Sequence, residues 1–406
     1  MEYLTHTLPN GIRLVHYPVK SHVAHFGFVV HTGSRDELPG EHGMAHFIEH
    51  VIFKGTQKRK AWHVLSRLED VGGEINAYTT KEDTCVYASF LKNDYQRAIE
   101  LIFDICFHSI FPQKEINKEK SIIIDEILSY KDSPYELIFD DFEEQVFNGH
   151  AIGRNILGDE TILAGFSRKS IFKFITDNYS TDEMVLSSVG NISFPKLIKL
   201  AEKYFGEAKH KTRIRNRVKP NSYQPEVIYA RKNTHQTHCA LGNTAYDAHN
   251  EKRTGLALLN NLLGGPGLNT RLNLSLREKH GYSYHVESQY TSYSDTGIIT
   301  VYFGCDKEKF KKSLNLVLRE FKVLREKKLG TLQLSKAKKQ LLGQVAIAAD
   351  SHEHLMLTMG KSILLNDKVD SMEEVSRKIE NVSASNLLEI ANEILDKNKI
   401  SILQYH

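Results

Sequence analysis

Apolar and polar positions along the chain predict the same series of elements twice. Runs of apolar and β-branched residues predict strands at 85–90 and 298–303, and apolar stripes at helical spacing predict helices at 44–51 and 115–128. The helices that follow the two strands begin near residues 94 and 115, and near residues 307 and 332. This repeat indicates an α+β fold of two homologous domains, each a mostly antiparallel sheet with helices over one face.

A change in composition separates the two halves. Between residues 209 and 225, lysines and arginines alternate with other residues before Pro220, as is typical of an extended, exposed linker. The predicted division is therefore a domain at 1–208, a basic linker at 209–225 and a second domain at 226–406. The net charge is only +3, and no aromatic residues interleave the basic run, so we expect no nucleic-acid partner.

The chain lacks the signals of membrane insertion and export. No apolar run reaches the roughly 18 residues that a membrane span requires. The first residues show neither a signal peptide nor a transit sequence. We therefore expect no membrane contact and a location in the bacterial cytoplasm.

One short run of residues has the spacing of a metal-binding motif. Residues 46–50 read His-Phe-Ile-Glu-His, so His46 and His50 lie one helical turn apart and both can bind one zinc ion. Glu49 lies beside them and can act as general base on a zinc-bound water. The apolar stripe on the opposite side indicates a packed helix: Met44, Phe47, Ile48 and Val51. This H-x-x-E-H order is the inverted zinc-peptidase signature.

A second predicted helix can complete the metal site. On it Glu119 and Glu126 lie seven residues apart, and therefore on one side after two turns. Glu126 can serve as third ligand and Glu119 can orient a ligand from one turn away. Asp125 competes with Glu126 for the ligand role. The predicted core positions of this helix are Ile116, Ile122, Ile123, Ile124 and Ile127.

These residues resemble the pitrilysin family of zinc peptidases, and most closely its short branch, which includes the mitochondrial processing peptidase β subunit and bacterial homologues. Glu126 follows His50 by 126 − 50 = 76 residues and Glu119 precedes it by seven, both as the family pattern requires. Further segments resemble family signatures in the expected order: 10–11, 33–35, 73–79, 149–154, 156–158, 189–191, 264–272 and 276–284. The resemblance covers nearly the whole chain.

The resemblance also implies roles for the second half. Arg277 and Tyr284 match the arginine and tyrosine with which active members grip substrate and stabilise the oxyanion. The second copy has Leu256–Leu259 in place of the histidine helix, so it cannot bind zinc there. The family architecture implies a clamshell in which the two domains enclose a chamber together with a second subunit. A homodimer is the simpler expectation, and a heterodimer with an inactive sister chain is the alternative.

The same resemblance predicts how a peptide substrate is held. Phe53 matches a position that contacts an aromatic residue just after the cut. Glu136 and Asp140 match an acidic pair that binds an arginine two residues before the cut, although they also suit a solvated acidic helix surface. The strand that includes Asn76 and Ala77 can pair with an extended peptide.

Two functional classes follow. The first is a zinc-dependent endopeptidase that cleaves peptides or unfolded, presequence-like segments inside a chamber. The alternative is a non-catalytic or partner-dependent subunit of a processing-peptidase-like complex. Members of the second class lose the base or a ligand, whereas this chain keeps Glu49 and all three predicted ligands, which favours the enzyme.

Overall fold

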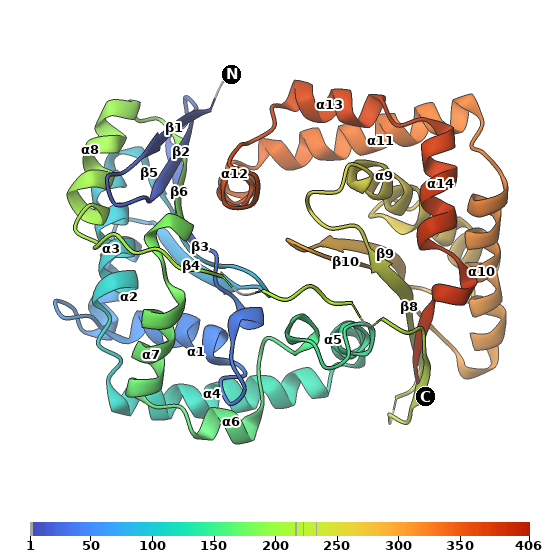
Figure 1. The fold of residues 1–406 in the computed structure, drawn as a ribbon, viewed down its shortest axis with the longest axis horizontal. Coiled ribbons are helices and arrows are strands. Elements are labelled where there is room, and N and C mark those ends of the chain that lie inside the picture. Colours follow the sequence, from blue (N-terminus) through green and yellow to red (C-terminus); the bar gives the residue numbers. More distant parts are fainter. Residues whose placement is uncertain (1–2, 216, 222, 233) are drawn as a thin grey trace. The chain divides into compact units, whose positions relative to one another are not determined.

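The computed structural model describes residues 3–215, 217–221, 223–232 and 234–406. The predicted linker therefore has no description at Asn216 and Ser222. The chain divides into two compact units, each built on its own sheet (Figure 1). Unit 1 comprises the described residues of Met1–Ile127, Arg154–Arg217 and Ile347–Val369, and unit 2 those of Leu128–Gly153, Val218–Ala346 and Asp370–His406.

The sheet of unit 1 has six strands in the order β1-β2-β6-β3-β5-β4. Their bounds are β1 Leu4–Thr7, β2 Arg13–Pro18, β3 Val23–Val30, β4 Glu74–Thr79, β5 Thr84–Leu91 and β6 Met184–Gly190. Only β2 and β6 run parallel; all other neighbours are antiparallel. Side chains alternate between the faces along β3, so Phe26 and Phe28 enter the main core while Val29 packs on the opposite face.

The sheet of unit 2 repeats this arrangement. Its strands are β7 Val227–Ala230, β8 Thr237–Ala245, β9 Val286–Ser292, β10 Gly297–Cys305 and β11 Ser401–Tyr405. Their order, β7-β11-β8-β10-β9, matches β2-β6-β3-β5-β4, and again only the first pair is parallel. The duplicated, mostly antiparallel α+β architecture predicted from the sequence is therefore confirmed.

Helices surround both sheets (Figure 1). Unit 1 contains α1 Met44–Val51, α2 Ala61–Glu69, α3 Tyr95–His108, most of α4 Gln113–Lys131, α6 Glu160–Ala164, α7 Arg168–Asn178, α8 Phe194–Phe205 and α12 His352–Asn366. Unit 2 contains α5 Pro134–Val146, α9 Arg253–Gly264, a π-helix Asn273–Lys279, α10 Phe310–Glu326, most of α11 Thr331–Asp350, α13 Met372–Glu380 and α14 Ala384–Ile394. Short 3-10 turns lie at Ser34–Asp36, Ile52–Lys54, Lys92–Asp94, Ala151–Gly153, Thr181–Glu183, Lys307–Lys309 and Lys397–Lys399.

Each sheet also receives one helix from the other half of the chain. Helix α12 packs on β3 and β6, and Met356 and Met359 are buried there with Val29. Helix α5 packs on β8 and β11 through Ile138 and Phe142. Both faces of each sheet are thus covered, not one face as predicted. The compact units therefore differ from the contiguous ranges 1–208 and 226–406, because these two helices are exchanged.

Helix α4 follows its predicted pattern with one correction. Ile116, Ile123 and Ile127 are buried in the core of unit 1, and Ile124 is partly buried against it. Ile122 is 39% exposed, so its assignment to the core was wrong. A helix has one buried stripe, and three consecutive isoleucines span about 200° of its circumference, so one of them faces away from the core.

The basic linker is extended, but its arginines are not exposed. Arg213, Arg215 and Arg217 alternate along this segment, and each has a nitrogen within 4 Å of the Asp36 carboxylate, whose side chain is only 2% exposed. Arg215 also pairs with Glu183. Alternate residues of an extended chain point to one side, and a buried carboxylate requires cations beside it. The sequence pattern predicts an exposed linker, and this is wrong, because the buried carboxylate that binds these arginines lies far away in the chain.

Among the described residues, no helix combines the length and the apolar character that crossing a membrane requires.

We predict that Arg217→Met destabilises the protein by about 3 kcal/mol, because it removes one partner of a buried ion pair. Arg217 lies 2.8 Å from Asp36 and 3.1 Å from Glu82, and its side chain is 8% exposed. Urea unfolding measures the loss. Lys219→Met is the control, since Lys219 is 66% exposed and its removal costs below about 0.5 kcal/mol. Equal small losses for both variants would contradict a stabilising role of the Arg217 ion pairs.

Candidate metal centre

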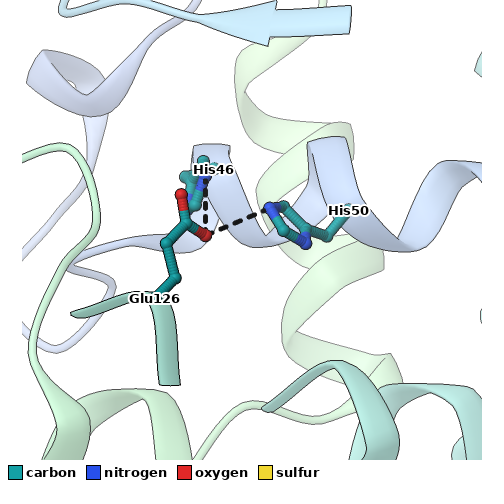
Figure 2. Close-up of side chains that lie close together, drawn as sticks. All are labelled: His46, His50 and Glu126. Carbon is teal, nitrogen blue, oxygen red and sulfur yellow. Dashed lines mark ion pairs between the residues drawn. The ribbon is translucent and has the colours of Figure 1, made fainter. Parts of the chain in front are cut away.

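Helix α1 presents an apolar face and a ligand face. Its apolar positions are buried in the core of unit 1: Met44, Phe47, Ile48 and Val51. His46 and His50 project side by side from successive turns, with ring centroids 4.6 Å apart (Figure 2). Packing of one face therefore fixes the direction of both imidazoles.

Glu126 of helix α4 points its carboxylate between the two imidazoles (Figure 2). One of its oxygens lies 3.8 Å from Nε2 of His46 and 3.5 Å from Nε2 of His50. Within the described part of the chain, these three side chains form the one group of ligand atoms close enough for a metal ion, all within 4.8 Å of one another. The neighbouring Asp125 is exposed and does not join them.

The donor set and spacing fit zinc. A tetrahedron with metal–ligand distances of about 2.1 Å has edges of about 3.4 Å, close to the separations from Glu126. Two imidazoles and one carboxylate leave a fourth position open, as in catalytic rather than structural zinc sites.

His46 is held in the neutral form that a metal ligand needs. It is only 7% exposed, and burial, with a smaller contribution from His50, lowers its pKa to about 3. Its Nδ1 atom is buried without a hydrogen-bond partner among the described residues. A neutral imidazole at pH 7 has a lone pair available for a cation.

His50 is oriented from behind by Glu119. The carboxylate lies 3.3 Å from Nδ1 of His50, which leaves Nε2 turned toward Glu126. Glu119 is 2% exposed, and its other oxygen lies 3.0 Å from the ammonium group of Lys54. A carboxylate that orients a metal-ligating histidine in this way fixes the tautomer and raises ligand basicity.

Glu49 lies in the same helical turn as His50 but outside the ligand group. Burial raises its pKa, and the Glu126 carboxylate adds to this rise, while Thr79 and His50 oppose it. Thr79 ends strand β4, so the sheet edge lies against the predicted base. A carboxylate with a raised pKa is better suited to accept and return a proton near neutral pH.

The predicted substrate-contact residues of unit 1 lie on or next to these elements. Strand β4 is the last strand of its sheet, bonded only to β5 among the described strands, and carries exposed Asn76 and half-buried Ala77. Phe53 is half-buried against the core in the 3-10 turn that continues α1.

The remaining predicted site residues lie in unit 2. Arg277 is in the π-helix, and its guanidinium lies 5.1 Å from the ring centre of Tyr284, which is 81% exposed. Glu136 and Asp140 lie one turn apart on α5, the first exposed and the second half-buried. Their functional roles stay predictions.

Sequence reasoning did not identify Lys54 and Thr79. Lys54 follows His50 by four residues, so helical spacing could have placed it near the same carboxylate. No sequence signal connects Thr79 with Glu49, because strand pairing and helix packing bring them together.

Comparisons with known proteins match most of the chain. Residues 14–160 match the family described as Insulinase (Peptidase family M16), and residues 165–341 match the family described as Peptidase M16 inactive domain. An uncharacterized zinc protease of Bacillus subtilis, YmxG, is 32% identical, with 97% of this chain and 96% of that protein covered. An uncharacterized zinc protease of Streptomyces coelicolor is 30% identical, with 96% and 87% covered.

Solved structures share the fold. A protease from Helicobacter pylori matches with a TM-score of 0.90 at 20% identity, covering 100% of this chain and 99% of that one. A Pseudomonas fluorescens structure described as a peptidase M16 inactive domain matches with a TM-score of 0.93 at 17% identity, covering 100% and 98%.

We predict that His46 makes the metal-free protein less stable in acid. Its pKa of about 3 in the fold lies below its ordinary value of 6.5, so below pH 6.5 the unfolded chain binds a proton that the folded chain does not. The free energy of unfolding therefore decreases as the pH is lowered below 6.5, by up to about 1.4 kcal/mol per pH unit from this group. Urea unfolding of the metal-free wild type and His46→Leu between pH 7 and 4.5 measures it. Parallel pH profiles of the two proteins would contradict the prediction.

Proposed function

Because this chain belongs to peptidase family M16, we propose that it is a zinc-dependent endopeptidase for peptides or unfolded segments. The observation that carries the proposal is the cluster of His46, His50 and Glu126, with Glu49 on the same helix. Degenerate relatives of such enzymes lose the base or a ligand, whereas this chain retains all four groups in one unit.

His46, His50 and Glu126 would hold the metal, which when bound would act as a Lewis acid and make a water molecule easier to deprotonate. Glu49 accepts the proton of the attacking water and returns it to the leaving amine. The buried setting of Glu49, which raises its pKa, supports both transfers. Glu119 holds the ring of His50 so that Nε2 stays turned toward the metal position.

We infer that the peptide binds as an additional strand on the free edge of β4. A strand edge offers unpaired N–H and C=O groups, so it recognises extended backbone with little dependence on sequence. Asn76 and Ala77 lie on this edge, three and two residues before Thr79. A substrate strand there would therefore run past the base, and folded proteins would be poor substrates.

We assign Arg277 and Tyr284 the stabilisation of the tetrahedral oxyanion. Their groups are neighbours, and the exposed phenol of Tyr284 is free to donate a hydrogen bond. This role requires that unit 2 present them to the substrate, in a chamber that two copies of the chain would complete.

Glu49→Gln should lower kcat by about 10³-fold without loss of zinc, because it removes the proton acceptor and leaves the three ligands. Cleavage of a mixed quenched-peptide library, with and without chelator and zinc add-back, measures the effect. Asp125→Asn is the control, since Asp125 is exposed next to Glu126 and outside the cluster.

Full activity of Glu49→Gln would overturn the assigned base. A zinc-loaded wild type that cuts no peptide would instead favour a subunit that needs a partner chain.

We further propose that Glu136 and Asp140 select an arginine two residues before the cut, because carboxylates one turn apart can bracket a guanidinium. Their joint replacement by alanine should reduce kcat/KM at least about tenfold for a peptide with arginine at this position. A matched peptide with glutamine there should be cut at an unchanged rate. Equal slowing of both peptides would contradict the assignment.

A further inference from the structure

Helix α1 begins without a cap of its own. Its N-cap residue is Gly43, which has no side chain to accept a hydrogen bond, although the first N–H groups of any helix need partners. Glu37, six residues earlier, fills this role with both oxygens. Oε2 accepts from the amide of Gly43 at 3.0 Å, and Oε1 accepts from the amide of Ala45 at 2.9 Å.

Glu37 is itself immobilised. It is 3% exposed, and its carbonyl oxygen accepts a hydrogen bond of 2.8 Å from the guanidinium of Arg154. Its amide donates to the carbonyl of Ser34 at 3.3 Å. The carboxylate is therefore a fixed point of unit 1 rather than a mobile surface group.

The opposite side of the helix start is closed by backbone. A Cβ atom at Gly43 would lie 2.7 Å from the carbonyl oxygen of Leu157, and one at Gly158 would lie 2.5 Å from that of His42. Gly43 also has φ +91°, a conformation that favours glycine. The start of α1 is thus held between the Glu37 carboxylate and the turn at Leu157 and Gly158.

We propose that Glu37 is a positioning residue that sets the height and rotation of α1 and thereby places His46, Glu49 and His50 for metal binding and proton transfer. The inference rests on the proposed function. His46 directly follows Ala45, whose amide Glu37 binds, so a shift at that amide moves the first ligand. Helix α1 has only eight residues, too few to hold its own geometry without such contacts.

The isosteric variant Glu37→Gln tests this role. Its amide oxygen can accept from one backbone N–H, but its NH₂ group would face the other N–H, so one bond is lost and two donors meet. Glu41→Gln is the matched control: Glu41 lies in the same loop, but its carboxylate accepts from the amide of Leu38 at 3.0 Å and not from α1. Burial raises the pKa of Glu37 to about 8. The wild type and both variants are therefore assayed at pH 8.5, so that Glu37, where present, is mostly ionised.

Two measurements report on the position of the ligands rather than on stability. Competition with a chelator gives the zinc affinity, which should fall 10–100-fold in Glu37→Gln, as for other groups that orient metal ligands. The visible absorption spectrum of the Co²⁺-loaded protein should change in position and intensity. Peptide assays should show a lower kcat with little change in KM, and Glu41→Gln should match the wild type throughout.

The outcomes separate this inference from the proposed function. Wild-type zinc affinity and an unchanged Co²⁺ spectrum in Glu37→Gln, even with a lower melting temperature, would overturn the positioning role and leave the peptidase proposal intact. If Glu37→Gln binds zinc more weakly but the wild type cuts no peptide, the positioning role is supported and the peptidase proposal is contradicted. A wild type that binds neither ion would overturn both.

If Glu37→Gln does not fold, Glu37→Asp replaces it. Aspartate keeps the charge but is one methylene shorter, so it cannot reach both amides, and the same reduction in zinc affinity is expected. Unchanged zinc affinity in Glu37→Asp would overturn the inference.

Discussion

The packing of helix α1 against the core of unit 1 is the contact on which the metal centre depends. Phe47 and Ile48 are buried on one side of this two-turn helix, and the same two turns direct His46 and His50 to the other. Because a helix rotates as one body, burial of the apolar stripe fixes both imidazoles at once. Ligands held by packing need little reorganisation when a cation arrives.

Four glutamates around this helix have the same chemistry and different tasks, and their surroundings decide which. Glu126 is partly exposed and faces the two imidazoles, so it is free to bind a cation. Glu119 is buried beside Lys54 and serves His50. Glu49 lies outside the ligand group, and burial raises its pKa. Glu37 accepts hydrogen bonds from two backbone amides, one with each oxygen. Removing one of them would therefore not be compensated by another.

Duplication explains both the symmetry of the sheets and the difference in their chemistry. Helix α9 takes the place in the second copy that α1 has in the first, but it carries buried leucines, including Leu256 and Leu259. The described residues of that copy therefore form a core there and no group of metal ligands. Each copy also gives one helix to the other sheet, α5 in one direction and α12 in the other. The exchange buries the second face of each sheet and ties the halves together by chain connectivity.

Local periodicity was enough to predict the parts of this protein that lie within one element. The spacing of His46 and His50 defines a ligand pair on any helix, and the repeated order of strands and helices defines the duplicated fold. Glu126 was found because helical spacing and the family resemblance agreed on it. Tertiary structure decided the rest: that Ile122 is exposed, that the linker arginines surround Asp36, that α5 and α12 change sheets, and that Glu37 holds the start of α1. These features depend on which surfaces meet, and residues far apart in the chain leave no periodic signal of their meeting.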